Sequence, residues 1–208
     1  MRGTAPINPS YGSELGTPID RHYENRFLAG HRHLITGRVL EIGDRHYTEH
    51  YGTGVTMSDV LNICPGEGVT WVGDLAACPE VPDDTYDCIV LTQVLHVIFD
   101  MQAAVAEVHR ILKPGGAVLC TVAGISQVNR GCMEEYGDRW RLTSQSAEEL
   151  FATAFPAGAI DVATYGNALT ACCFLQGVPA ERVPQVKLDR WEPDYQLTVA
   201  VVAVKAPA

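Results

Sequence analysis

The stretch that decides the fold is YDCIVLTQVLHVIFDMQAAVAEVHRILKPGGAVLCTVAG, residues 86–124. It opens on a nearly continuous apolar run, which is typical of a strand covered on both faces in a parallel sheet. Asp100 then stands where it can cap a helix, and apolar side chains recur at helical spacing until KPGG ends the pattern. A second apolar strand follows at residues 117–124. A strand, a helix and a strand in this order predict a parallel crossover unit.

Similar patterns lie on both sides of this unit. Upstream, a helical apolar face begins at Asp20, and β-type runs follow at residues 39–43, 55–62 and 69–75. Downstream, Ser146 with Glu149 matches a capping box before a helix. Strands are expected at residues 159–166 and 196–205, around a helix or buried segment at residues 167–178. The alternation predicts a doubly wound α/β sheet, with the two closing strands antiparallel at one edge.

Length and composition narrow the classes of protein that fit. A chain of 208 residues most simply forms one domain, so we expect a flexible arm or lid at residues 1–19 and a single domain at residues 20–208. The net charge of -10 and the scattered basic residues disfavour nucleic acid and anionic membrane as partners. No apolar run approaches about 18 residues, which predicts a cytoplasmic protein. The seven cysteines have no metal-ligand spacing, so we expect reduced thiols and no metal.

Polar residues follow the predicted strands, and ligands of an open α/β sheet bind beyond the carboxyl ends of its strands. After the second strand, Asp59 can accept hydrogen bonds from both hydroxyls of a ribose. Together the strand ends predict an adenosine-shaped site. The residues concerned, in strand order, are Glu41, Gly43 and Asp44, then Asp59, then Gly73, Asp74 and Leu75, then Thr92, Gln93 and His96.

The residues that follow the first predicted strand distinguish between two classes of cofactor. A dinucleotide needs a glycine-rich turn whose backbone amides meet the pyrophosphate, but here only Gly43 is present, between Glu41 and Asp44. These acids would repel phosphate and favour S-adenosylmethionine, which has no phosphate and carries a sulfonium and an ammonium. A nicotinamide-dependent oxidoreductase on a related sheet is therefore disfavoured.

A set of motifs in this order resembles a known family. GRVLEIGD, SDVLN, GDL, PDDTYDCIVLTQVLHVIFD, AEVHRILKPGG and AVLCTVAGIS are similar to the class I S-adenosylmethionine-dependent methyltransferases of the small single-domain type, over about residues 36–126. YTEHYG, WRLTSQSAEELF, TYGN and EPDYQLTVAVVAVK resemble a bacterial subgroup often met beside genes for glycan and secondary-metabolite assembly. The resemblance implies a Rossmann-like sheet of seven strands, mostly parallel with an antiparallel last strand. One departure is that Arg45 replaces the usual glycine, so the cofactor loop must follow a different path.

The resemblance also implies roles for individual residues. Glu41 and Gly43 match the first cofactor motif, and Asp59 matches the ribose-binding acid. Asp74 and Leu75 match the adenine-binding pair, while the backbone carbonyls of Thr92 and Gln93 match the ammonium-binding strand end. Tyr47 is expected to close over the methionyl part in place of the missing glycine. Asp59 and Asp74 have an alternative interpretation as caps of local helical turns.

Three further groups of residues have two readings each. Arg21 and Tyr23 are expected to cover the methionyl end of the cofactor, with Arg21 on its carboxylate, or else to be helix surface and core. His96 is the candidate general base, or it packs against the cofactor. Tyr136, Trp140 and Arg141 are expected in the acceptor wall, or in ordinary packing.

These residues lead to one main functional hypothesis and one alternative. We expect methyl transfer from S-adenosylmethionine to an oxygen of a small molecule, a sugar hydroxyl or a natural-product scaffold, with S-adenosylhomocysteine as product. The alternative is a protein that binds S-adenosylmethionine without transferring methyl, as a structural partner or a cofactor-assisted cyclase. The altered loop at Arg45 keeps this alternative open. No oligomeric state is predicted.

Overall fold

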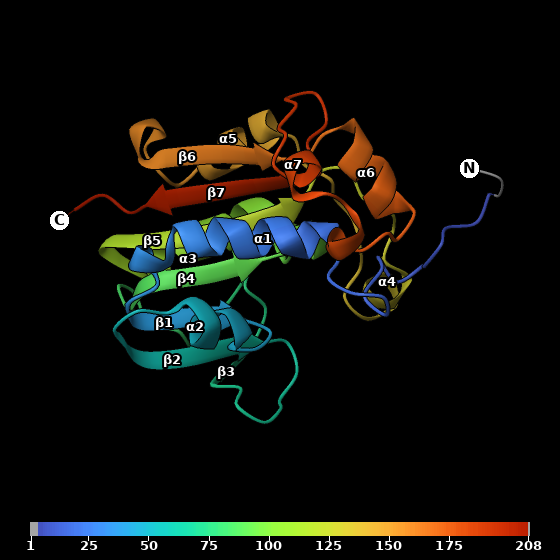
Figure 1. The fold of residues 1–208 in the computed structure, drawn as a ribbon. Helices are drawn as coiled ribbons and strands as arrows, with labels where there is room; N and C mark the ends of the chain where they lie inside the picture. The colour runs from blue at the N-terminus through green and yellow to red at the C-terminus, as the bar shows by residue number, and fades with distance from the viewer. Residues whose placement is uncertain (1–3, 208) are drawn as a thin grey trace.

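Seven strands form one sheet in the order β3-β2-β1-β4-β5-β7-β6 (Figure 1). The computed structural model describes residues 4–207. Pairing is parallel throughout except for β7, which runs antiparallel to both β5 and β6. The predicted doubly wound sheet and its antiparallel closing pair are thus confirmed. The strands are β1 (Gly37–Ile42), β2 (Val55–Asn62), β3 (Trp71–Val72), β4 (Tyr86–Thr92), β5 (Leu112–Ala123), β6 (Ile160–Tyr165) and β7 (Thr198–Val204).

Helices cover both faces of this sheet. On one face α1 and α2 pack through Phe27, Leu28 and Tyr47, and on the other α3 and α5 pack through side chains such as Val105 and Leu150 (Figure 1). Short helices α4, α6 and α7 lie at the end of the sheet toward which the parallel strands run. The helices are α1 (Ile19–Gly30), η1 (Arg32–Leu34), α2 (His46–Tyr51), η2 (Leu95–Val97), α3 (Met101–Ile111), α4 (Arg130–Glu135), α5 (Ser144–Phe151), η3 (Ala157–Ala159), α6 (Ala168–Leu175), η4 (Ala180–Arg182) and α7 (Gln185–Leu188).

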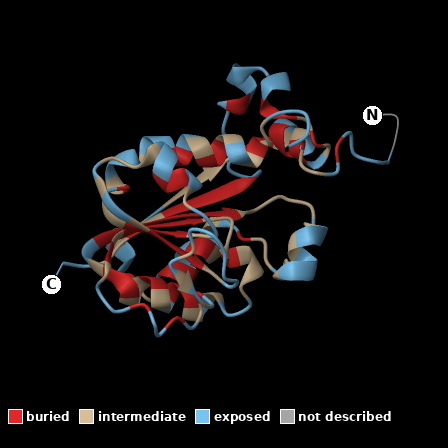
Figure 2. Cartoon of the chain, turned by 90° about the horizontal axis from the view of Figure 1, so that it is seen from below, coloured by how far each residue is buried: buried red, intermediate tan, exposed pale blue. Residues whose placement is uncertain are grey.

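The central strands are buried on both faces, as the continuous apolar run of residues 86–92 predicts (Figure 2). Cys88, Ile89, Val90 and Leu91 of β4 are all fully buried. Because both faces are covered, polar ligands have access to these strands only at their ends.

The predicted helix behind β4 is confirmed in detail. Asp100 Oδ1 accepts the backbone N–H of Ala103 at 3.0 Å, which caps α3. The apolar face of α3 is buried at Ala104, Val105, Val108 and Ile111. The helix ends at Ile111, and β5 begins at Leu112.

The capping box predicted from Ser146 and Glu149 is wrong in its position, because the box of α5 is formed by Thr143 and Ser146. Thr143 is the N-cap residue of α5, with an extended backbone, and Ser146 stands at the third helical position. Their side chains exchange hydrogen bonds with each other's backbone N–H groups, at 3.2 Å and 2.9 Å. Glu149 instead accepts from Gln145 Nε2 on the exposed surface. Since Thr143 can already provide the cap, the helix begins two residues before the predicted start at Ser146.

The described part of the N-terminal arm packs against α6 and the segment that follows it. The backbone N–H groups of Ile7 and Asn8 both donate to the Gln176 carbonyl oxygen. Further along, both carboxylate oxygens of Glu181 accept from Thr17 N, at 3.1 and 3.0 Å. Residues 1–3 of the predicted arm lie outside the described range, and the division at residue 19 stays a prediction.

Within residues 4–207, every helix is too short or too polar to cross a membrane.

The close approach of β5 and the chain before β7 generates a stability prediction. Gly124 N donates to the Leu197 carbonyl oxygen at 3.0 Å, and a Cβ on Gly124 would overlap the Gln196 carbonyl oxygen. We expect Gly124→Ala to lower the free energy of unfolding by about 2–3 kcal/mol, measured by urea titration. Gly30→Ala is the matched control, because a Cβ there meets no described atom within 4 Å. Equal urea midpoints for Gly124→Ala and the wild type would contradict this close approach.

Candidate active site

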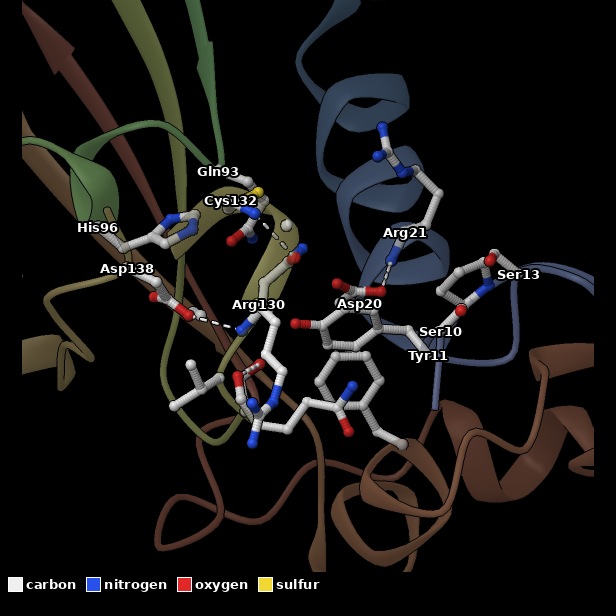
Figure 3. A pocket seen from close by; sticks show the side chains of 18 of the residues that line it. Ser10, Tyr11, Ser13, Asp20, Arg21, Gln93, His96, Arg130, Cys132 and Asp138 are labelled. Carbon is white, nitrogen blue, oxygen red and sulfur yellow. Dashed lines mark hydrogen bonds between the residues drawn. The ribbon is translucent and has the colours of Figure 1, made fainter. Parts of the chain in front are cut away.

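A cavity of about 810 Å³ opens at the carboxyl ends of β4 and β5 (Figure 3). Asp20 and Tyr11 lie on one side of it, and His96 and Asp138 lie on the other. The arm, the start of α1 and the segment after β5 close around these strand ends. The polar side chains that line it are Ser10, Tyr11, Ser13, Asp20, Arg21, Gln93, His96, Ser126, Gln127, Asn129, Arg130, Cys132, Asp138 and Arg141.

The turn after β1 leaves a backbone surface open. Gly43 has φ +96°, and no described atom lies within 4 Å of the place that a Cβ would take. Glu41, just before it, is 2% exposed, and its two oxygens accept from Tyr47 N at 3.0 Å and Thr48 N at 2.7 Å. Burial raises the pKa of Glu41, and these two bonds partly offset that effect. Glu41 therefore holds the first turn of α2, while Gly43 is the part of the motif open to a ligand.

Arg45, at the position of the missing glycine, bridges two loops. Its Nη2 donates to the Gly68 carbonyl oxygen at 2.6 Å, in the connection between β2 and β3. The helix α2 begins directly after Arg45 at His46. The loop thus keeps a single glycine, and the Arg45 side chain ties it to the neighbouring loop beyond β2.

Asp59 does not lie at the end of β2. The strand continues to Asn62, because its pairing with β1 extends to Ile42 and Leu61. Asp59 is 5% exposed, and its Oδ2 accepts from Arg38 Nε at 2.7 Å and from Tyr86 Oη at 3.1 Å. These contacts place it inside the sheet, which does not fit the expected ribose contact. Asn62, which sequence reasoning missed, stands at the strand end and donates from Nδ2 to the Gly43 carbonyl oxygen at 3.2 Å.

The two residues predicted to bind adenine face different ways after β3. Asp74 is exposed, and its Oδ1 accepts from Ala76 N at 2.9 Å, which forms a local turn. Leu75 is 3% exposed and packs in the core beside α3. Asp74 is therefore accessible at the strand end, whereas Leu75 is a core residue.

Of the two α1 residues expected at the methionyl end, only Arg21 lines the cavity. Tyr23 is 1% exposed, stacks on Tyr165 at 5.6 Å between ring centroids, and donates to the Leu188 carbonyl oxygen at 3.1 Å. This is the core role that the sequence left as its alternative. Arg21 lies over the Tyr47 ring, at 5.3 Å to its centroid, and donates to the Tyr47 hydroxyl.

Behind Arg21 lies Glu24, a buried acid that sequence reasoning missed. Glu24 is 1% exposed, and its Oε2 accepts from the Tyr47 hydroxyl at 2.7 Å and lies 3.5 Å from Arg21 Nε. Burial, followed by the nearby Asp20 carboxylate, raises the pKa of Glu24 to about 7. The spacing of Asp20 and Glu24, four residues apart on one helical face, was the available signal.

The end of β4 provides two side chains to the cavity. Gln93 has φ +52°, a conformation that non-glycine residues seldom adopt, and its N–H donates to the Thr121 carbonyl oxygen at 2.8 Å. The His96 carbonyl oxygen accepts from Arg139 N at 2.9 Å and Trp140 N at 3.1 Å, which fixes this turn. Burial lowers the pKa of His96, so its imidazole is neutral near pH 7. Thr92 is the last residue of β4 and lies outside the cavity lining.

The wall opposite α1 is built on an acid that sequence reasoning also missed. The Asp138 carboxylate is 1% exposed and accepts from Arg141 Nη1 at 2.5 Å, Arg141 Nη2 at 2.9 Å and Asn129 N at 2.7 Å. Of the three residues expected in this wall, Arg141 lines the cavity. The indole N–H of Trp140 donates to the Ile98 carbonyl oxygen, and the Tyr136 hydroxyl donates to Glu135; neither residue lines the cavity.

Comparisons with known proteins point to one kind of domain. A family model described as a methyltransferase domain matches residues 38–120. The malonyl-acyl-carrier-protein O-methyltransferase of Serratia marcescens is 33% identical over 70 residues, which are 34% of this chain and 25% of that protein. A ubiquinone/menaquinone biosynthesis C-methyltransferase of Desulfotalea psychrophila is 30% identical over 91 residues, 41% of this chain and 37% of that protein. The chain thus spans well under half the length of these relatives.

The fold is shared over a longer part of the chain. The N-methyltransferase NodS of Bradyrhizobium japonicum WM9, solved with S-adenosyl-L-homocysteine, superposes with a TM-score of 0.57 at 14% identity. The superposition covers 97% of this chain and 94% of that one. At this identity the likeness establishes the fold, and the expected seven-stranded architecture is confirmed.

The buried Glu24 carboxyl generates a prediction on pH and stability. Its folded-state pKa of about 7 lies above its ordinary value of 4.5, so the folded protein retains a proton that the unfolded chain releases. We therefore expect the contribution of Glu24 to the free energy of unfolding to fall as pH rises from about 5 to about 8, so that over this range the wild type loses more stability, or gains less, than Glu24→Gln does. Urea titrations at several pH values measure it, with the exposed Glu149→Gln as control. Equal pH slopes for Glu24→Gln and the wild type would refute the prediction.

Proposed function

We propose that this chain, which has the class I S-adenosylmethionine-dependent methyltransferase fold and a matching domain at residues 38–120, transfers methyl to an oxygen of a small polyhydroxylated acceptor. A sugar or a hydroxylated natural product is the acceptor class. The observation that carries the proposal is the polar cavity at the carboxyl ends of β4 and β5, together with the open turn at Gly43, which follows β1, the strand paired with β4. In an open α/β sheet a ligand site is expected at this edge.

The residues present fit S-adenosylmethionine better than a phosphate-bearing cofactor. The left-handed, open backbone of Gly43 allows close approach of a ligand, and the acids Glu41 and Asp44 flank it. Gln93 lines the cavity, and its Nε2 is buried without a hydrogen-bond partner within residues 4–207. Such atoms are rare, and an oxygen of a bound ligand could accept a hydrogen bond from this nitrogen.

The fit assigns roles at the strand ends. Gly43 would meet the centre of the cofactor through its backbone, and Asn62 and Asp74 would meet its ribose and adenine. Arg21 would meet the methionyl carboxylate, with Tyr47 packed beneath it. Asp59, Leu75 and Tyr23 support the site from inside the protein.

When bound, S-adenosylmethionine supplies an electrophilic methyl group on a sulfonium. The task of the chain is then to hold the acceptor oxygen in line with that methyl group and to exclude water. Hydroxyl and amide side chains on the segment after β5 suit a neutral acceptor with several hydroxyls, because each can both donate and accept hydrogen bonds. These side chains are Ser126, Gln127 and Asn129, with Ser10 and Ser13 from the arm.

His96 is our candidate for the general base. Its ring lies beside Asp138 at the cavity, and its Nδ1 is buried without a partner in the described chain (Figure 3). Burial lowers its pKa below the ordinary 6.5, although the Asp138 carboxylate acts in the opposite direction. A neutral imidazole can accept the proton that an acceptor hydroxyl loses as its oxygen is methylated.

The strand-end assignment leads to a prediction of affinity. We expect Asn62→Ala and Asp74→Ala each to weaken S-adenosylhomocysteine binding about fivefold, as the loss of about 1 kcal/mol of hydrogen bonding requires. Asp59→Asn is the matched control: it should lower the unfolding midpoint, since Asp59 pairs with Arg38, and leave the affinity of the folded protein within about twofold. Isothermal titration measures the affinities. A larger affinity loss in Asp59→Asn than in Asn62→Ala would restore Asp59 as the ribose ligand.

The role of His96 leads to a prediction of activity. S-adenosylhomocysteine release is followed with a panel of monosaccharides and phenolic natural products. For an accepted substrate, we expect kcat/KM to rise with pH and to level off above a pKa below 6.5. His96→Asn should reduce kcat about 10²–10⁴-fold and abolish this ionisation.

Two outcomes of this experiment would count against the proposal. An unchanged pH profile in His96→Asn would remove His96 from proton transfer. Binding of S-adenosylmethionine without methylated product from any acceptor would favour a protein that binds the cofactor without transferring methyl.

A further inference from the structure

The N-terminal arm reaches the cavity through one tight turn at residues 10–13. A hydrogen bond from Ser13 N to the Ser10 carbonyl oxygen closes the turn at 3.0 Å. Its two central residues, Tyr11 and Gly12, have φ +60° and φ +89°. Turns with positive φ at both central positions are dominated by glycine, asparagine and aspartate, and a bulky residue seldom adopts this conformation. The turn thus carries a tyrosine at a position whose backbone favours a smaller residue.

The turn is held in place by contacts that do not involve the side chain of Tyr11. Asn8 is 5% exposed, and its Oδ1 accepts from two backbone N–H groups of the turn, at 2.8 and 3.0 Å. Gln127 Nε2 donates to the Pro9 carbonyl oxygen at 2.7 Å, which joins the arm to the segment after β5. Because these bonds fix the backbone on both sides of the cavity, they can impose the strained conformation on Tyr11.

The Tyr11 ring forms part of the cavity wall. It stacks on Phe174 of α6, with 5.4 Å between ring centroids and 27° between the ring planes. Phe174 is 2% exposed, whereas Tyr11 is only half-buried and lines the cavity. In Figure 3 the ring points from the arm toward the side of the cavity that holds His96 and Asp138. The cavity therefore has a flat aromatic surface with a hydroxyl at its tip, across from the candidate base.

Folding alone does not explain a tyrosine at this position. Glycine or asparagine would adopt the same backbone at a lower cost, and the contact with Phe174 buries only part of the ring. Residues held in strained backbone conformations cluster at sites where their side chains meet a ligand. Tyr11 has both properties, since its backbone is strained and its ring lines the cavity.

We propose, on the basis of the proposed function, that Tyr11 is a specificity-determining residue that selects acceptors with a ring. The face of a sugar ring or of a phenolic ring can pack against the aromatic surface. An open-chain polyol offers no such face, and it loses more conformational freedom when it binds. Packed on Tyr11, a cyclic acceptor would be held with one hydroxyl directed toward His96, as in-line transfer requires.

The test compares cyclic and open-chain acceptors with variants of Tyr11. S-adenosylhomocysteine release is measured with myo-inositol and with sorbitol, which have the same numbers of carbon atoms and hydroxyl groups. Methyl glucoside and catechol then distinguish a sugar ring from a phenolic ring. Tyr11→Asn removes the ring and suits the left-handed turn, while Tyr11→Phe keeps the ring. Leu15→Asn is the matched control, because Leu15 belongs to the same arm, is 41% exposed and lies outside the cavity lining.

Two further measurements separate this role from a structural one. Isothermal titration gives the affinity of each variant for S-adenosylhomocysteine, and urea titration checks that each variant is folded. A residue that only anchors the arm would change the urea midpoint and leave the preference among acceptors as it is.

We expect the wild type to methylate a cyclic acceptor with a kcat/KM at least about tenfold above that for sorbitol. Tyr11→Asn should raise KM for the cyclic acceptor about 10–100-fold, and Tyr11→Phe should stay within about fivefold of the wild type. Leu15→Asn should leave KM unchanged, and every variant should bind S-adenosylhomocysteine within about twofold of the wild type.

Three outcomes would overturn the role of Tyr11 while the proposed function stands. They are an unchanged KM in Tyr11→Asn, equal use of sorbitol and the cyclic acceptors by the wild type, and a loss of S-adenosylhomocysteine affinity in Tyr11→Asn as large as the rise in KM. Binding of S-adenosylmethionine without a methylated product from any acceptor would overturn the proposed function, and the role of Tyr11 with it.

Discussion

The capping of α2 by the buried Glu41 carboxylate is the interaction on which the site depends. The first N–H groups of a helix have no intrahelical partner, and Glu41 accepts two of them, from Tyr47 and Thr48. A carboxylate there is further favoured by the helix dipole. Because the acid comes from β1 itself, α2 must start within a few residues of Gly43, and it does so at His46. That start places Tyr47 against α1, where its hydroxyl meets Glu24 at 2.7 Å.

Charge is distributed unevenly around the cavity that this arrangement creates. On one side, Asp138 and Arg141 neutralise each other and are fixed by the backbone of Asn129. On the other, Asp20 and Glu24 exceed the single guanidinium of Arg21. The two sides of the cavity therefore differ in how far their charged side chains are paired.

The segment that matches the family model and most of the cavity lining are different parts of the chain. The family model ends at residue 120, and of the side chains that line the cavity only those of Gln93 and His96 fall within it. The remaining lining comes from the arm, the start of α1 and the chain after β5. One sheet can host many functions, because what a site binds is set by the side chains placed around it.

The sequence by itself determined the sheet and its order of elements, since the continuous apolar strand at residues 86–92 and the Asp100 cap are local signals. Tertiary structure decided which polar residues reach the site. Asp59 and Asn62 lie on one strand, and the β-type run at residues 55–62 already ended at Asn62 in the sequence; only the contacts of Asp59 with Arg38 and Tyr86 show that its side chain is held inside the protein. Neighbours on α1 likewise differ in direction, so Tyr23 enters the core while Glu24 faces Tyr47. Local sequence patterns show the periodicity of a helix or strand. The register of paired strands and the direction in which each side chain faces depend on packing between segments that are distant in the sequence.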